Sequence, residues 1–157
     1  MAIADMYLKI QGVTGEAEDA DHKGEIQIAS WSWGLQGSVS ATSGQATGRT
    51  TVGELQLVKN VDRSSPTLML YLYNNKLINE AQLIVRKAGK TPLEYFRIEL
   101  EKARVTSFKI ETSGAEVVER FSLGFQKVKC SYTPQDQTGA RGGGTNEVEF
   151  DAHPGSS

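Results

Sequence analysis

The stretch Glu-Ile-Gln-Ile-Ala-Ser-Trp-Ser-Trp-Gly-Leu-Gln-Gly, residues 25–37, contains both tryptophans of the chain, Trp31 and Trp33. Each indole ring can bury roughly 150–250 Å², which corresponds to at most about 4–6 kcal/mol at about 25 cal/mol per Å². Because side chains alternate along an extended chain, the two rings lie on one side of a strand. The stretch therefore predicts a strand whose tryptophan side is covered by a large surface.

The apolar side of this strand changes within the stretch. The two isoleucines that precede the tryptophans share one side, whereas the two tryptophans share the other. Either a bulge inserts one residue and exchanges the two faces, or the strand is covered on both sides. In the second interpretation Ser30 and Ser32 continue the isoleucine side, so that a small polar patch follows an apolar one.

Composition narrows the class of protein. A chain of 157 residues is long enough for one domain with a core of its own. Its 17 basic and 19 acidic residues are interspersed and leave a formal net charge of −2, which predicts no nucleic-acid partner. The N-terminal residues lack the basic and apolar regions of a signal peptide, and no apolar run approaches about 20 residues, so we expect no membrane insertion. Cys130 is the only cysteine and is expected to be a small buried hydrophobic residue.

The remaining chain predicts strands. Alternating apolar and polar residues predict strands over residues 6–10, 52–61, 83–86, 95–101, 105–111 and 118–132, and a short edge strand over 147–150. In the longest strand the apolar residues change from odd-numbered to even-numbered positions near Gln126 and Lys127, which predicts a bend or bulge there. Long bent strands suit a closed barrel or two packed sheets. We assign residues 1–151 to one domain and expect residues 152–157 to be a disordered tail.

One helix is expected after residue 64. Ser65 is placed to cap its exposed amides, and Pro66 fits the first helical position, where no amide partner is lost. The following segment, Leu68 to Tyr73, is apolar almost without interruption. The helix is therefore either buried on most sides or in contact with a second surface.

Two loops partly match the sequence patterns of known ligand-binding sites. The acidic loop at residues 16–21 copies part of a calcium-binding pattern, but Lys23 occupies a ligand position, so we expect a solvated charged loop. The long loop from Gly37 to Gly53 has the glycine spacing of a phosphate-binding loop, but Glu54 replaces the required lysine. A loop of this length is usually functional or disordered, because contacts must offset the entropy lost on ordering it.

Catalysis has little support in the sequence. A triad or a zinc site would require His22, in the acidic loop, to meet His153, near the end of the chain. The carboxylates of Glu99, Glu101 and Glu119 are expected on solvent-facing sides of strands. We therefore expect no enzyme activity, no cofactor and no metal, and a small β-rich binding or assembly domain. The competing classes are a monomeric β-barrel that binds a small apolar ligand and a hydrolase on a barrel scaffold.

Four motifs occur in a fixed order along the chain. They are Trp31-Ser32-Trp33-Gly34, Asp62-Arg63-Ser64-Ser65-Pro66-Thr67-Leu68-Met69, Leu83-Ile84-Val85-Arg86-Lys87-Ala88-Gly89 and Tyr132-Thr133-Pro134-Gln135. Together with the small-residue loop that follows the first motif, they resemble the Hcp family (hemolysin-coregulated protein), the inner-tube proteins of bacterial type VI secretion systems. The resemblance runs from about Asp5 to Phe150. It implies a mainly β fold, a tight antiparallel β-barrel of two packed sheets flanked by a single α-helix.

The resemblance also implies a function as a structural tube component. Six copies are expected to form a ring, and the rings to stack into a tube that carries small effector proteins in its lumen. The further partners are the contractile sheath and the spike proteins of the secretion machine. The protein is then expected in the bacterial cytoplasm and, after expulsion by that machine, outside the cell without a signal peptide.

Site residues follow from the same resemblance. It places Ser32, and with it Ser30, on the lumen wall that faces the effectors. It assigns the contacts with a neighbouring ring or protomer to the long loop, with the residues Gly44, Gly48, Arg49 and Thr50. The residues of the structural motif are Trp31, Trp33, Gly34, Ser65 and Pro66.

Overall fold

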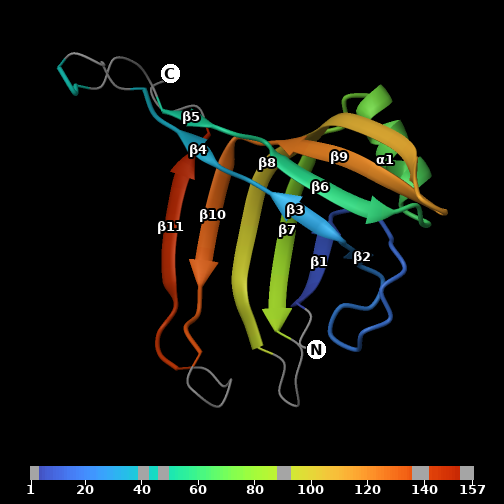
Figure 1. The fold of residues 1–157 in the computed structure, drawn as a ribbon, viewed down its shortest axis with the longest axis horizontal. Coiled ribbons are helices and arrows are strands. Elements are labelled where there is room, and N and C mark those ends of the chain that lie inside the picture. Colours follow the sequence, from blue (N-terminus) through green and yellow to red (C-terminus); the bar gives the residue numbers. More distant parts are fainter. Residues whose placement is uncertain (1–3, 39–42, 46–49, 88–92, 136–141, 153–157) are drawn as a thin grey trace.

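The computed structural model describes residues 4–38, 43–45, 50–87, 93–135 and 142–152. These residues form eleven strands and one helix (Figure 1). In chain order the elements are β1 (Ala4–Ile10), β2 (Ile26–Gln27), β3 (Ser30–Ser32), β4 (Leu35–Gln36), β5 (Thr51–Val52), β6 (Leu55–Asn60), α1 (Ser65–Tyr73), β7 (Ile78–Lys87), β8 (Leu93–Ser113), β9 (Glu116–Gly124), β10 (Lys127–Tyr132) and β11 (Asn146–Asp151).

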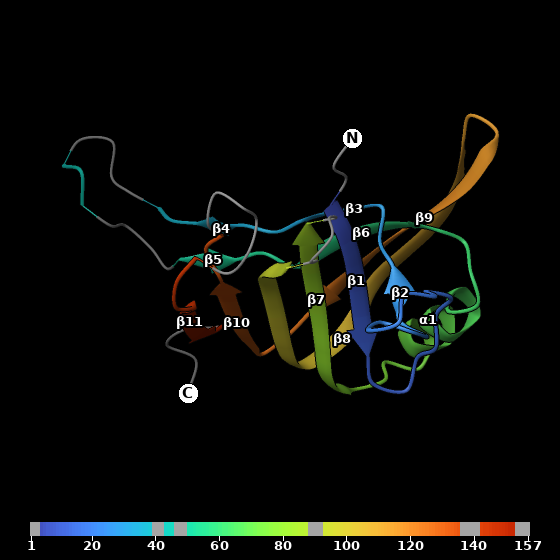
Figure 2. The ribbon, with the colours of Figure 1, turned by 90° about the horizontal axis from the view of Figure 1, so that it is seen from below.

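Nine of the eleven strands form two packed sheets that share β8, and β4 and β5 form a separate two-stranded ladder. Sheet A contains β2, β1, β7, the first half of β8, β10 and β11, and sheet B contains the second half of β8, β9, β6 and β3. All of these pairs are antiparallel. Figures 1 and 2 show β10 and β11 at one end of the molecule and the β8–β9 hairpin at the other.

The long strand β8 changes sheets near its middle. Ala103 is its last residue paired with β7, and Arg104 is its first residue paired with β9. Directly before this point Lys102 has a positive φ of 51°, which turns the strand. A bulge between Val105 and Ser107 adds a second irregularity. One strand can therefore belong to both layers.

The inner sides of the two sheets carry the alternating apolar residues. Leu57 and Phe121 of sheet B and Leu8, Ile98 and Leu100 of sheet A are at most 2% exposed. The predicted bend near Gln126 is confirmed, because β9 ends at Gly124 and β10 begins at Lys127 in the other sheet.

The prediction of a mainly β fold with two packed sheets and a single flanking helix is confirmed for the described residues. The ladder of paired strands is not closed into a barrel, because its two ends, β2 and β3, do not pair with each other. The two residues between β2 and β3, residues 28 and 29, carry the chain from one end of the ladder to the other. The amide of Ile28 donates to the Met6 carbonyl on β1 over 3.0 Å, and the amide of Ala29 donates to the Val58 carbonyl on β6 over 2.8 Å.

The helix α1 forms where it was expected, but its start differs in detail. It begins at Ser65, so Pro66 is its second residue, and no side chain of the described residues caps its first amides. The Ser65 hydroxyl instead accepts hydrogen bonds from Lys59 Nζ at 3.1 Å and from the Asp62 amide at 3.0 Å. Among the described residues, no helix has both the length and the apolar character of a membrane span.

The helix buries one side and exposes the other. Leu68 is completely buried against the core, whereas Met69, Leu70 and Tyr73 are 40%, 55% and 86% exposed. The interpretation in which most sides of the helix are buried is therefore wrong for this chain.

Two expectations about polar residues are also wrong. Glu119 was expected on a solvent-facing side but is completely buried beside Lys59. His22 was expected in a solvated loop but is 3% exposed, and its ring stacks on Tyr7 with centroids 4.5 Å apart. Arg86 holds the acidic loop in place through an ion pair with Asp19.

The first residue of the predicted tail, residue 152, packs against the domain. Ala152 is buried, and its amide donates to the Gln126 carbonyl over 2.8 Å. The predicted disordered tail otherwise falls on residues 153–157, which lie outside the described residues.

Candidate functional site

Strand β3 and the residue that follows it, Trp33, cover part of the inner side of sheet A. Trp31 stacks on Phe96 of β8 with centroids 5.8 Å apart, and Trp33 stacks on Phe150 of β11 at 6.2 Å. Trp33 Nε1 also donates a hydrogen bond to the Gly53 carbonyl over 2.8 Å. The large surface that the two rings require is therefore an aromatic part of the same chain.

Ser30 and Ser32 are exposed on the side of β3 opposite the tryptophans. The interpretation in which they continue the isoleucine side is wrong, because Ile26 and Ile28 are 0% and 4% exposed and belong to the same core that the tryptophans cover. The residues that face the core change from even-numbered to odd-numbered positions here, because the chain leaves sheet A at Ile28 and joins sheet B at the next residue.

The strand register extends this serine surface across sheet B. Ser32 is paired with Gln56 on β6, Gln56 with Ser122 on β9, and Ser122 with Ser107 on β8. Residues that are directly paired in adjacent strands place their side chains on the same face of the sheet. A row of polar side chains therefore crosses four strands on the outer side of sheet B.

Hydrogen bonds link the hydroxyls at the centre of this row. Ser122 Oγ lies 2.7 Å from Thr106 Oγ1 and 2.6 Å from Ser107 Oγ. Both partners reach Ser122 because the bulge in β8 places two residues opposite one. We define the hydroxyl face as Ser30, Ser32, Gln56, Thr106, Ser107 and Ser122.

Charged groups at the margin of the hydroxyl face are mostly paired. Glu111 contacts Arg120 at 2.6 Å and Lys109 at 3.6 Å, and the hydrogen bond from Arg120 lowers the pKa of the Glu111 carboxyl. On the other side Glu54 accepts a hydrogen bond from Thr106 over 3.0 Å. A Cβ at Gly124 would lie 2.9 Å from the Glu54 carboxylate, so glycine leaves room for this contact.

The long loop is only partly described. Gly44 and Thr50 are exposed, whereas Gly48 and Arg49 lie outside the described residues. The segment of residues 43–45 lies away from the two sheets in both views (Figures 1 and 2). The loop begins and ends at the short ladder of β4 and β5, in which Leu35 is paired with Val52. Gly34 lies at the base of this ladder, and its carbonyl accepts a hydrogen bond from the Gly53 amide over 2.9 Å.

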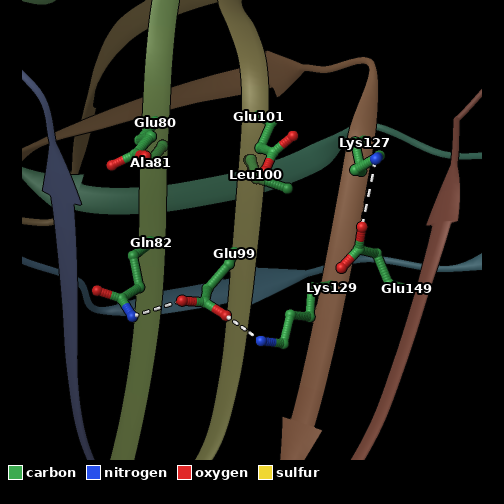
Figure 3. A pocket seen from close by; sticks show the side chains of 9 residues that line it. All are labelled: Glu80, Ala81, Gln82, Glu99, Leu100, Glu101, Lys127, Lys129 and Glu149. Atoms are coloured by element: carbon green, nitrogen blue, oxygen red, sulfur yellow. Dashed lines mark hydrogen bonds and ion pairs between the residues drawn. The ribbon is translucent and has the colours of Figure 1, made fainter.

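A groove of about 240 Å³ crosses the outer side of sheet A. Several of its charged side chains contact partners on neighbouring strands (Figure 3). Glu99 contacts Gln82 at 3.3 Å and Lys129 at 3.7 Å, and Lys127 contacts Glu149 at 3.3 Å. The hydrogen bond to Glu149 raises the pKa of Lys127, which keeps this lysine protonated and unsuited to act as a base or nucleophile.

The candidate catalytic residue His22 lies between two carboxylates. His22 contacts Glu25 at 2.9 Å and Glu94 at 3.3 Å, and its side chain is buried. Its expected counterpart His153 lies outside the described residues. No group of three or more His, Cys, Asp or Glu in the described part of the chain is arranged to hold a metal ion. The hydroxyl face can donate and accept hydrogen bonds with a polar partner.

Sequence reasoning missed four residues of the hydroxyl face. They are Gln56, Thr106, Ser107 and Ser122. A partial signal was present, because Gln56 alternates with Leu55 and Leu57, and Ser122 lies between Phe121 and Leu123. Only the register of the strands places these polar positions beside Ser32.

Comparisons with known proteins agree with this fold. A family model described as "Type VI secretion system effector, Hcp" matches residues 7–132. Protein hcp1 of Pseudomonas aeruginosa is 37% identical over an alignment of 145 positions, which covers 89% of this chain and 90% of that protein. The crystal structure of Hcp1 from Salmonella typhimurium has a TM-score of 0.77 at 32% identity and covers 97% of this chain and 96% of its own. The crystal structure of a type VI secretion system effector from Yersinia pestis has a TM-score of 0.75 at 27% identity and covers 94% and 99%.

Proposed function

Because the chain belongs to the Hcp family of type VI secretion system effectors, we propose that it is a structural subunit of the inner tube of such a system. Six copies form a ring, and the rings stack into a tube. Small effector proteins occupy its lumen, and the tube leaves the bacterial cytoplasm with them when the sheath contracts. In this role the protein assembles and carries cargo, and it catalyses no reaction.

The hydroxyl face is the observation that carries the cargo part of the proposal. Its residues are neutral, five of the six are exposed, and they lie on the outer side of sheet B. Short hydroxyl side chains offer many weak hydrogen bonds without a fixed charge, which suits a wall that must hold different proteins and release them. Ser32 and Ser30 lie on this face, as the proposal requires.

The packing of the interior favours the tube subunit over a ligand-binding barrel. A barrel that binds an apolar molecule needs an internal cavity. Here the space between the sheets is filled by completely buried side chains, among them Leu8, Leu83, Ile98 and Leu123 at 0% exposure.

The loop between β4 and β5 supplies a contact between rings or protomers in this proposal. Gly44 and Thr50 are exposed at its described parts, and Gly48 and Arg49 belong to the same loop. The other partners are the sheath and the spike proteins of the machine.

Light scattering on the purified protein tests the proposal. We expect a particle with six times the mass of the 17.1 kDa chain and, by negative-stain microscopy, a ring with a central opening. A monomer at high micromolar concentration would contradict the tube function. A monomer that also binds a small apolar molecule would favour the ligand-binding barrel.

A further inference from the structure

Four side chains form a continuous chain of hydrogen bonds on the outer side of sheet B. Thr106 Oγ1 donates to Glu54 Oε1 over 3.0 Å. Ser122 Oγ lies 2.7 Å from Thr106 Oγ1 and 2.6 Å from Ser107 Oγ. Glu54 and Ser107, at the two ends, are exposed, whereas Ser122 in the middle is only 1% exposed. We define the hydroxyl chain as Glu54, Thr106, Ser122 and Ser107.

The direction of every hydrogen bond in the hydroxyl chain follows from its carboxylate end. Oxygen atoms as close as these share a hydrogen, and each hydroxyl has only one to give. A carboxylate accepts, so the hydrogen of Thr106 is used on Glu54. The hydrogen between Thr106 and Ser122 therefore belongs to Ser122. Ser122 has no second hydrogen, so the one between Ser122 and Ser107 belongs to Ser107.

Ser107 consequently presents only lone pairs to a partner. Its single hydrogen lies against Ser122, and its oxygen is the exposed end of the hydroxyl chain. Successive hydrogen bonds polarise one another, so the charge of Glu54 makes the Ser107 oxygen a stronger acceptor than an isolated hydroxyl. This end of the hydroxyl face therefore accepts hydrogen bonds and does not donate them.

Two features of the backbone keep the hydroxyl chain together. The bulge in β8 places Thr106 and Ser107 both opposite Ser122. At Gly124 a Cβ would lie 2.9 Å from Glu54 Oε2 and 3.1 Å from Thr106 Cγ2, so a larger residue would displace the carboxylate end. Both ends of the hydroxyl chain are thus set by backbone features of sheet B.

We propose that Ser107 is an acceptor site for the peptide N–H groups of cargo proteins, and that Glu54 fixes this preference. An oxygen without a free hydrogen binds donors, and the peptide N–H is the donor common to all proteins. The partial positive charge of an N–H hydrogen complements the polarised Ser107 oxygen. The inference rests on the proposed function, in which this face lines the lumen, and it names the chemical group through which the wall recognises different cargo proteins.

Neighbouring charges favour this neutral donor over a cationic one. Lys109, two residues from Ser107 on β8, and its register partner Arg120 lie on the same side of sheet B. Both cations contact the single carboxylate of Glu111. Positive charge is therefore already in excess beside Ser107, and a lysine or arginine of the cargo is disfavoured there.

Two short peptides that differ only in their amide hydrogens test the inference. An acetylated glycine peptide that ends in a dimethylamide supplies N–H donors. Its sarcosine counterpart carries a methyl group on each of those nitrogens and supplies none. The NMR shifts of the Ser107 and Ser122 amides during titration give a dissociation constant for each peptide. We expect the glycine peptide to bind about 2- to 10-fold more tightly, as one hydrogen bond contributes.

Two variants show whether the hydroxyl chain causes this preference. Thr106→Val keeps the shape of the side chain and the charge of Glu54 but removes the link between Glu54 and Ser122. Glu54→Gln supplies an amide that can donate to Thr106, so the hydroxyl chain can run in either direction. We expect the ratio of the two dissociation constants to fall towards one in both variants.

A third variant is the matched control. Thr112→Val makes the same change as Thr106→Val on the same strand, outside the hydroxyl chain. It is expected to keep the wild-type ratio. Because Glu54, Thr106 and Thr112 are all exposed, we expect each variant to fold, which circular dichroism and the thermal midpoint check.

Neutron diffraction on a deuterated crystal measures the direction of the hydroxyl chain itself. We expect the deuterium of the Ser107 hydroxyl between its own oxygen and Ser122 Oγ. A deuterium that points from Ser107 into solvent would overturn the inference.

The outcomes separate the inference from the function on which it rests. If the wild type forms rings but binds the two peptides equally, or if Thr106→Val keeps the wild-type ratio, the inference is overturned while the tube function stands. If the wild type is a monomer that still prefers the glycine peptide, the acceptor site stands, and its role towards cargo in a lumen is overturned together with the proposed function.

Discussion

Lys59 Nζ lies 3.0 Å from Glu119 Oε2, and both side chains are completely buried. The two residues are directly paired across β6 and β9 on the inner side of sheet B. Lys59 Nζ also contacts Asp62 at 2.9 Å and the Ser65 hydroxyl at 3.1 Å. This ion pair therefore joins the end of sheet B to the start of α1.

Removing one partner of this pair is expected to destabilise the fold strongly. Lys59→Met leaves the Glu119 carboxylate buried without its cation, which costs about 3–5 kcal/mol in the free energy of unfolding. Urea denaturation followed by tryptophan fluorescence measures the loss. The matched control is the double variant Lys59→Met/Glu119→Leu, which removes both charges and is expected to lose much less. An equal loss in both variants would show that packing, and not the unpaired charge, is responsible.

Acid stability is expected to depend on Asp62. Burial raises the pKa of this carboxyl, but hydrogen bonds from Ser64 and Lys59 outweigh the burial, so its pKa in the folded protein lies below the ordinary value. A carboxyl with a lowered folded pKa contributes stability above its unfolded pKa of about 4, and this contribution is lost as the pH falls through the folded pKa. We therefore expect Asp62→Asn to be less stable than the wild type at pH 7 and the difference to shrink below about pH 4. Denaturant midpoints across this range measure it, and a constant difference would contradict the assignment.

Cargo retention is expected to depend on Ser32. Ser32→Arg places a long charged side chain on the hydroxyl face, where it occupies space and adds a fixed charge. We expect the ring to form normally and the co-purification of a bound effector to fall at least tenfold. Thr14→Arg, at another exposed hydroxyl residue, is the control and should retain cargo. Unchanged retention in Ser32→Arg would show that cargo binds another surface.

The hydrogen bond of Trp33 can be separated from its stacking. Trp33→Phe removes the donor to the Gly53 carbonyl but keeps an aromatic ring beside Phe150, and it is expected to cost about 0.5–1.5 kcal/mol. Trp33→Ala removes both contacts and is expected to cost about 3–5 kcal/mol. Denaturant unfolding measures both variants by circular dichroism. Equal costs would mean that the stacking contributes little to stability.

The reactivity of Cys130 is expected to be low in the wild type. Burial raises the pKa of this thiol, so less of the reactive thiolate is present at a given pH than for an exposed cysteine. Alkylation by iodoacetamide should therefore reach its half-maximal rate at a higher pH than in the unfolded protein. If the two profiles coincide, the thiol is solvated as in the unfolded chain.

Much of the fold could be predicted from local patterns. The alternation of apolar residues in β1, β6 and the first half of β8 indicated these strands, and the serine–proline pair at residues 65–66 indicated the helix. The apolar residues change from odd-numbered to even-numbered positions near Gln126, and this change indicated the point at which the chain passes from one sheet to the other. Such patterns succeed because side-chain alternation and helix starts depend on residues close together in the sequence.

The candidate site could be predicted only in part. Ser30 and Ser32 were identified, but the rest of the hydroxyl face was not, because Gln56, Ser107 and Ser122 are far from them in the sequence. The register of the strands brings these residues together, and register depends on pairing between distant segments.

The sequence by itself determined which residues share a side of each strand, where the helix forms and which family the chain resembles. Only the tertiary structure decided which of those sides is inner. Glu119 is buried because it meets Lys59 across the sheet, and the faces of residues 26–33 are exchanged because the chain crosses from one sheet to the other. The physical reason is that burial depends on the opposing layer, which is supplied by segments distant in the sequence. For the tryptophans that layer is sheet A, through Phe96 and Phe150.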